Sequence, residues 1–208
     1  NIGTAKMAAS LGGRRLENFY RSLGFMDQSP IELPERGTPI YPSPWHDIST
    51  LTTSFGHGIA VSPLHLMRAA SALVNGGKMP RSTLLMQNVS ATETEMPQES
   101  RVVSPQTSDK IRQLMELTVV DGTGNNAYVE GYNVGGKTGT AEKNSKGIYN
   151  RNSLLSSFIG AFPIQAPRYT VLVMIDEPQG TSDTHGYATG GWTAAPVVAA
   201  VVEQMAPL

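Results

Sequence analysis

The stretch GYNVGGKTGTAEK, residues 131–143, separates two possible folds for this chain. Gly131, four further residues and the triplet Gly136-Lys137-Thr138 match the phosphate-loop pattern. A phosphate loop follows a buried strand and opens a helix, whose first backbone N–H groups hold the phosphates. The same residues can instead form one extended strand with an ammonium and two hydroxyls along its edge.

The flanking segments favour the strand. Residues 122–130, GTGNNAYVE, are too polar and too rich in glycine for a buried strand, and residues 139–152 show no helical period. The apolar segment 171–177 ends in Asp-Glu, as a magnesium-binding strand of an ATPase does, but only PIQAPR separates it from the preceding strand. Parallel neighbours need a crossover of about a dozen residues or more. We therefore predict an antiparallel sheet. Its three strands are expected at about residues 132–141, 153–162 and 169–176.

The composition excludes several classes of protein. The 208 residues are 39% hydrophobic and 16% charged, with a net charge of −1 and no cysteine. This charge leaves no basic stripe for nucleic acid, and the lack of cysteine excludes disulfides and thiolate metal sites. No apolar run reaches the roughly 18 residues that a membrane span requires. We expect a globular α/β chain of the α+β type, in which helices flank the antiparallel sheet, and no membrane contact from this segment.

Helical periodicity and end signals mark five segments, at about residues 4–11, 16–23, 63–75, 105–121 and 197–205. Ser62-Pro63 and Ser104-Pro105 each combine an N-cap residue with proline at the first helical position. On the third segment, the side chains expected to face inward are Leu64, Met67, Ala70 and Val74. On the fourth, those expected to share one face are Ile111, Leu114, Met115 and Thr118.

Other segments carry weaker signals. Residues 26–48 contain five prolines and predict a long irregular loop, and residues 79–101 predict an exposed hairpin or arm. Residues 169–176 are apolar on both faces, which is typical of a central strand. The last helix is apolar nearly all round, so we expect it to be buried against the sheet.

The predicted first strand carries groups suited to a substrate that ends in a carboxylate next to a reacting amide. The Lys137 ammonium and the hydroxyls of Thr138 and Thr140 can bind the carboxylate, and backbone N–H groups can stabilise an oxyanion. Alternation places the two threonines on one face and Lys137 on the other, so either strand twist or a curled side chain must bring the ammonium around. Gly135 and Gly136 lack side chains, so another backbone or a ligand can approach there.

Several ordered fragments extend this interpretation: NIGTAKMA, SFGHGIAVSPLHLMRAASALVNGG, GGKTGTAEK, SFIGAFP, RYTVLVMIDEP and GYATGGWTAAPVV. In this order the chain resembles the transpeptidase domain of class B penicillin-binding proteins, especially the cell-division (septal) peptidoglycan D,D-transpeptidases. The resemblance implies the penicillin-binding transpeptidase or serine β-lactamase-like fold. It also implies that residues 1–208 are the C-terminal portion of that domain, with the nucleophile-bearing segment and early sheet strands upstream, so that an unpaired strand edge is left.

The family's mechanism implies a role for each matching residue. Asn1 corresponds to the last residue of the Ser-x-Asn motif, which orients substrate and a catalytic lysine. Lys137, Thr138 and Gly139 correspond to the Lys-Thr-Gly motif: Lys137 is its cation, and Gly139 keeps the strand edge open. Thr138 and Thr140 would bind the donor carboxylate, and the Thr140 backbone N–H would complete the oxyanion hole. The resemblance thus assigns catalysis to Asn1, Lys137 and Thr140, and substrate binding to Lys137, Thr138, Gly139 and Thr140.

The resemblance also implies partners and a location. Expected partners are peptidoglycan stem peptides ending in D-Ala-D-Ala, β-lactams, the upstream part of the same protein, and cell-division proteins. The full-length protein would be anchored in the cytoplasmic membrane and act on its periplasmic or extracytoplasmic face. We expect no cofactor and no metal, because the four histidines show no ligand spacing.

The family's nucleophile motif, Ser-x-x-Lys, is not found in these 208 residues. None of the six lysines has a serine three positions before it. The residues at that spacing are Gly3, Asn75, Thr107, Val134, Thr140 and Lys143. We therefore expect the chain alone to be catalytically inactive.

Three alternatives stay open. A serine β-lactamase shares Lys-Thr-Gly but needs a general base for deacylation, and no such residue is identified. A non-catalytic receptor lobe for peptidoglycan or β-lactams would also lack the nucleophile. Nucleotide binding ranks last.

Overall fold

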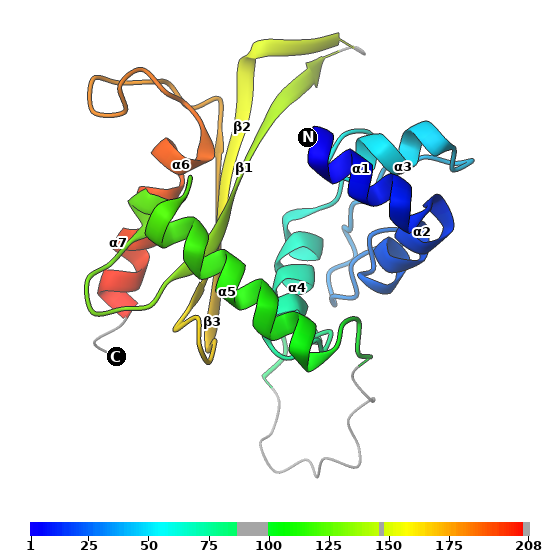
Figure 1. Cartoon of the computed structure of the whole chain (residues 1–208), viewed down its shortest axis with the longest axis horizontal. Coiled ribbons are helices and arrows are strands. Elements are labelled where there is room, and N and C mark those ends of the chain that lie inside the picture. The colour runs from blue at the N-terminus through cyan, green and yellow to red at the C-terminus, as the bar shows by residue number, and fades with distance from the viewer. Residues whose placement is uncertain (87–99, 146–147, 206–208) are drawn as a thin grey trace. The chain divides into compact units, whose positions relative to one another are not determined.

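The computed structural model describes residues 1–86, 100–145 and 148–205. The chain divides into two compact units. The first comprises Asn1–Ala72 with Lys78–Val102, and the second comprises Leu73–Gly77 with Val103–Leu208. Figure 1 traces the helices and strands of each.

The first unit is helical. Its helices are α1 (Ile2–Leu11), α2 (Gly13–Ser22), α3 (Asp47–Thr53) and most of α4 (Pro63–Val74). Gly12 separates α1 from α2 with a φ of 88°, and Gly24, just after α2, has a φ of 77°. Both values lie in the left-handed region that glycine adopts at no steric cost, which is why these helices end there. The expected helix ends at both glycines are confirmed.

Helix α3 was not expected within or beside the long proline-rich loop. It has only seven residues, too few for a hydrophobic period to be recognised. His46 and Ser49 form a reciprocal capping box at its start. The sequence signal is unusual because histidine stands where serine or threonine is common.

The buried face of α4 differs from the predicted one. Its buried residues are His65, Ala69, Ala72 and Val74, so of the four expected residues only Val74 is fully buried. His65 is 1% exposed because its ring nitrogens have partners: Ser62 Oγ at 2.8 Å from Nδ1 and the Asp27 carbonyl at 2.8 Å from Nε2. A buried polar ring is tolerated when its hydrogen bonds are made, and hydrophobic periodicity does not register it.

The second unit is built on an antiparallel sheet. Its strands are β1 (Gly135–Ser145), β2 (Ile148–Phe162) and β3 (Tyr169–Asp176), in the order β1-β2-β3 (Figure 1). Its remaining elements are α5 (Pro105–Asp121), the 3-10 helix η2 (Asn125–Ala127), α6 (Gly190–Thr193) and α7 (Ala195–Met205). The antiparallel prediction is confirmed, and so is the α+β class. The phosphate-loop interpretation is wrong, because residues 137–140 lie within β1 and no helix begins there.

The core of this unit lies between the sheet and α7. Phe158 of β2 and Val198 and Val202 of α7 are fully buried in one cluster. Val198 lies so close to Gly160 that an added Cβ would come within 3.0 Å of its Cγ1. The buried final helix was therefore predicted correctly, although Val197 is 43% exposed.

Two further expectations need correction. Within the described residues β3 pairs only with β2, so it is an edge strand of this sheet and not its central one, and its Met174 is 39% exposed. On α5, Leu114 is 64% exposed, and the fully buried positions are Ser108 and Val119. Ile111, Met115 and Thr118 are half-buried, so the predicted stripe is wrong only at Leu114. It also omitted Ser108, whose hydroxyl donates to the Leu73 carbonyl. Of the predicted arm at 79–101, residues 87–99 lie outside the described part of the chain.

Candidate active-site strand edge

Strand β1 carries four of the five predicted site residues, one after another, along one edge of the sheet. Lys137 is opposite Ile159 and Gly139 is opposite Ser157, whereas Thr138 is opposite Phe158 and Thr140 is opposite Ser156. Cross-strand partners share a face of the sheet. Thr138 and Thr140 therefore lie on the Phe158 face, where α7 packs, and Lys137 lies on the other, as the alternation predicted.

Core side chains occupy the space beside the two glycines that open β1. A Cβ on Gly136 would lie 2.2 Å from the Phe158 ring, and a Cβ on Gly135 would lie 2.5 Å from Ile164. Both glycines are buried. Another backbone also approaches Gly135, where an added Cβ would lie 3.1 Å from the Glu116 backbone nitrogen of α5. The expected approach of a second backbone is therefore confirmed there, whereas core side chains fill the rest of the space beside the two glycines.

The Lys137 side chain is exposed, and its ammonium lies against the backbone of its own strand. Its Nζ donates to the Thr138 carbonyl at 2.7 Å. In the part of the chain that the structure describes, no carboxylate lies within ion-pair distance of this ammonium. A carbonyl partner leaves the positive charge unneutralised, so it can attract a ligand carboxylate.

The two threonine hydroxyls each have a partner from a distant segment. Thr138 Oγ1 lies 3.0 Å from Thr123 Oγ1, in the turn that follows α5. Thr140 Oγ1 accepts a hydrogen bond of 3.1 Å from the backbone N–H of Gly190, at the start of α6. A hydroxyl that accepts a hydrogen bond keeps its own hydrogen to donate, and the exposed Thr140 side chain can offer it to a carboxylate.

Sequence reasoning missed Thr123 and Gly190. They lie 15 and 50 residues from their partners. Thr123 lies in the polar segment 122–130, and Gly190 lies in the fragment GYATGGWTAAPVV, which carries the resemblance but no sign of a contact with β1. Nothing in the spacing of these residues links them to β1.

Gly139 leaves no room for a side chain at this edge. An added Cβ would lie 2.5 Å from Ser157 Oγ on the neighbouring strand. The glycine therefore keeps β1 and β2 at normal pairing distance opposite the serine and leaves the strand between the two threonines without a projecting group.

Asn1 belongs to the helical unit, and the four other site residues belong to the sheet unit. It is exposed, it precedes α1, and its carbonyl accepts the first helical hydrogen bond from Ala5. Its side chain makes no cap hydrogen bond. The role assigned to Asn1 by resemblance stays a prediction.

A charged cluster lies farther along β1. Lys143 Nζ is 2.9 Å from Asp176 Oδ1 and 3.0 Å from Glu177 Oε1, at the end of β3. Hydrogen bonds from Ser153 and then from Lys143 lower the pKa of Glu177, and hydrogen bonds to Asp176 and then to Glu177 raise the pKa of Lys143. Glu177 has a φ of 51°, unusual for a residue with a Cβ. The Asp-Glu pair that resembles a magnesium site is thus used in an ion pair.

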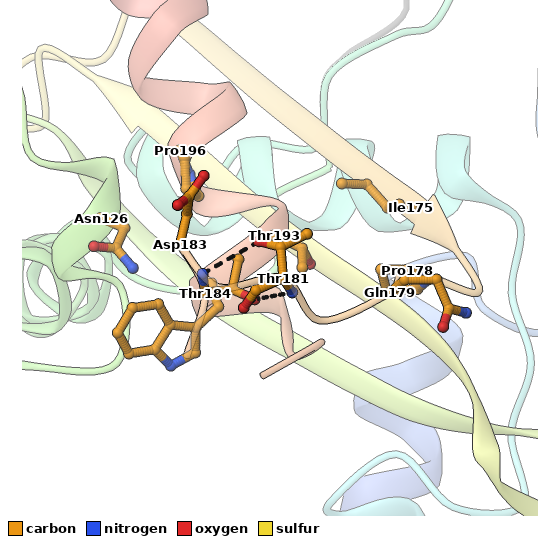
Figure 2. Close-up of a pocket in the computed structure, with 10 residues that line it drawn as sticks. Asn126, Ile175, Pro178, Gln179, Thr181, Asp183, Thr184, Thr193 and Pro196 are labelled. Carbon is orange, nitrogen blue, oxygen red and sulfur yellow. Dashed lines mark hydrogen bonds between the residues drawn. The ribbon is translucent and has the colours of Figure 1, made fainter. Parts of the chain in front are cut away.

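A cavity beside α6 does not contain the predicted site. Its volume is about 540 Å³. Figure 2 shows residues that line it, among them Asn126 and Thr193. Its other lining residues are Ile175, Pro178, Gln179, Thr181, Asp183, Thr184, Trp192 and Pro196. The candidate site is instead an open strand edge, suited to an extended ligand. Among the described residues no group of three or more His, Asp or Glu could hold a metal ion.

None of the described helices is both long enough and apolar enough to cross a membrane.

Comparison with known proteins assigns a family. Residues 1–203 match the model of the penicillin binding protein transpeptidase domain. The chain is 41% identical over 216 residues to the probable peptidoglycan D,D-transpeptidase FtsI of Caulobacter vibrioides, covering 100% of this chain and 36% of that protein. It is 36% identical to stage V sporulation protein D of Bacillus subtilis, covering 100% of this chain and 32% of that protein. The chain spans about a third of the length of these relatives.

Solved structures agree on the fold. The TP domain of penicillin-binding protein 3 from Burkholderia pseudomallei, in its apo form, superposes with a TM-score of 0.85 at 33% identity, covering 99% of this chain and 60% of that one. Penicillin-binding protein 3 from Mycobacterium tuberculosis, complexed with ampicillin, gives a TM-score of 0.86 at 26% identity, covering 99% of this chain and 48% of that one.

Proposed function

The chain belongs to the family of penicillin-binding protein transpeptidase domains, and from this premise we propose that the full-length protein is a serine-type peptidoglycan D,D-transpeptidase. The supporting observation is the β1 edge, where two hydroxyls follow an ammonium that has no carboxylate partner among the described residues. This chain would be the C-terminal portion of the transpeptidase domain, and the nucleophilic serine would lie upstream.

The reaction needs a donor peptide held by its terminal carboxylate. Lys137 attracts that carboxylate, and Thr138 and Thr140 donate hydroxyl hydrogens to it. The upstream serine attacks the penultimate D-alanine carbonyl, and the tetrahedral oxyanion is stabilised by the Thr140 backbone N–H. The terminal D-alanine leaves, and the acyl group passes to an amine of a neighbouring stem peptide. Asn1 would orient the substrate and the catalytic lysine, and Gly139 keeps the edge unobstructed.

A β-lactam would follow the same path as far as the acyl-enzyme. Its carboxylate takes the place of the D-alanine carboxylate, and its strained amide is the group attacked. The ampicillin complex of the Mycobacterium tuberculosis relative is consistent with this behaviour in the family. We also infer a periplasmic or extracytoplasmic location, a membrane anchor in the full-length protein, and cell-division proteins as partners.

Replacing Lys137 tests this function. In the full-length protein, Lys137→Ala should slow acylation by a fluorescent penicillin by at least ~100-fold, the effect of losing one preorganised electrostatic group. The measurement is the second-order rate constant for labelling. Lys110→Ala, on α5, removes an equal charge away from β1 and should leave the rate unchanged. An unaltered rate in Lys137→Ala would remove Lys137 from the site.

A non-catalytic receptor lobe is the second candidate, because these 208 residues contain no Ser-x-x-Lys. The codons upstream of Asn1 distinguish the two. A Ser-x-x-Lys sequence there supports the enzyme, and its absence from the whole gene supports the receptor.

A further inference from the structure

The segment Ala188–Gly191, here called the 188–191 segment, contacts β1 backbone to backbone. Gly190 donates its N–H to Thr140 Oγ1 at 3.1 Å. A Cβ on Gly190 would lie 2.2 Å from the Ser157 carbonyl oxygen and 2.5 Å from that of Gly139. This proximity puts the Gly190 N–H within reach of the threonine, so the position of the segment controls the hydrogen bond.

Ser156 holds one end of the segment. Its Oγ donates to the Ala188 carbonyl at 2.5 Å, and its side chain is 0% exposed. Ser156 is also the cross-strand partner of Thr140, so the two side chains share a face of the sheet. A buried serine in that place has one donor, and it is used to hold the segment beside the threonine.

Asn126 holds the other end. Asn126 lies in η2, and its Nδ2 donates to the Gly191 carbonyl at 2.9 Å. Gly191 is buried, and a Cβ there would lie 2.2 Å from the Thr123 carbonyl oxygen. Asn126 also lines the cavity beside α6 (Figure 2). The two hydrogen bonds thus flank Gly190 on both sides.

We propose that Ser156 and Asn126 are positioning residues that act through the 188–191 segment to orient the Thr140 hydroxyl toward the substrate carboxylate. The hydroxyl oxygen has one hydrogen to donate and can accept from others. When the Gly190 N–H donates to the Thr140 hydroxyl oxygen, rotation of that hydroxyl is restricted and its hydrogen is left to donate to the carboxylate. Without the two side chains, the segment can withdraw, and the hydroxyl can turn to any of its staggered positions. The inference rests on the proposed function, since it assumes that Thr140 binds a donor carboxylate.

The test measures acylation of the full-length protein by a fluorescent penicillin. Ser156→Ala should reduce the second-order acylation rate constant by roughly tenfold, the value of one well-placed hydrogen bond. Asn126→Ala should act in the same direction. Ser182→Ala, in the β3–α6 loop, is the control. The Ser182 hydroxyl is exposed, and its only described hydrogen bond is to Asp183 at 3.4 Å, so the variant should leave the acylation rate unchanged.

A double-mutant cycle separates positioning from general loss of structure. Thr140→Val removes the hydroxyl and keeps the shape and the backbone N–H. If Ser156 acts through that hydroxyl, adding Ser156→Ala to Thr140→Val should cause little further loss of rate. An equal loss in both backgrounds would overturn the proposal, as would an unchanged rate in Ser156→Ala alone.

A second measurement does not depend on acylation. Amide hydrogen exchange at Gly190, followed by NMR, should be faster in Ser156→Ala than in the unaltered protein because the segment opens more often. If the unaltered protein is not acylated, the proposed function fails, and exchange then tests only whether Ser156 holds the 188–191 segment. Unchanged exchange overturns the inference whether or not the protein is acylated.

Discussion

Two lysines of β1 show how neighbours decide what a charged residue does. Lys137 has a carbonyl as its partner, and its charge is left for a ligand, whereas Lys143 is neutralised by Asp176 and Glu177. Both are exposed or nearly so, and both were visible in the sequence. Only the three-dimensional partners separate the lysine that we propose to bind substrate from the one held in an ion pair.

The ion-pair cluster of Lys143, Asp176 and Glu177 predicts how its contribution to stability depends on pH. The pKa of Glu177 lies below its ordinary value, so its contribution to stability is present above the ordinary pKa and is lost as pH falls through the lowered one. The pKa of Lys143 is raised, so its contribution is present below the ordinary lysine pKa and is lost as pH rises through the raised one. Lys143→Met should move the pKa of Glu177 up toward its ordinary value.

NMR titration of the Glu177 side-chain carboxyl carbon checks this shift. Lys110→Met should leave the Glu177 titration where it is. The hydrogen bond from Ser153 persists in Lys143→Met, so a partial shift is expected. A Glu177 titration that does not move would show that Lys143 is not its electrostatic partner in solution.

At the scale of elements, local signals located helix ends well and inward faces poorly. Ser104-Pro105 and Gly122 bound α5 as expected, because caps and proline act within one turn. The buried serine of α5 and the buried histidine of α4 were missed, because burial of a polar group depends on partners supplied by distant segments. Strand pairing was predicted because a short connection permits only an antiparallel neighbour.

The cap of α5 can be measured directly. The Ser104 hydroxyl oxygen accepts from the Thr107 backbone N–H at 3.1 Å. Ser104→Ala should lower the free energy of unfolding by about 1 kcal/mol, as measured by chemical denaturation of this chain. Ser182→Ala is the matched control. An unfolding free energy that is the same in all three proteins would show that the cap does not contribute.

On the scale of the whole molecule, the chain carries the proposed carboxylate-binding edge but no Ser-x-x-Lys motif. None of its lysines follows a serine at the spacing of the family's nucleophile motif. The chain spans about a third of the length of its relatives, and we propose that the nucleophile lies upstream of the matched residues. A carboxylate-binding edge alone lowers no barrier to breaking an amide, because acyl transfer needs an activated nucleophile.

The isolated chain should therefore form no covalent adduct with fluorescent penicillin. The measurement is in-gel fluorescence after denaturation, with the full-length protein labelled in parallel as the positive control. A stable adduct on the isolated chain would show that one of its own serines is activated, which would contradict the assignment of the nucleophile to the upstream segment.

The sequence by itself determined the antiparallel sheet and the order of Lys137, Thr138, Gly139 and Thr140 along one strand. Connection length and the two-residue period of a strand are properties of a short piece of chain, so they can be recognised without coordinates. The tertiary structure decided which groups hold those residues: Thr123 beside Thr138, and Gly190 beside Thr140. It also filled the space beside Gly135 and Gly136 with core side chains. Such contacts join segments far apart in sequence, and packing of the whole sheet unit brings them together.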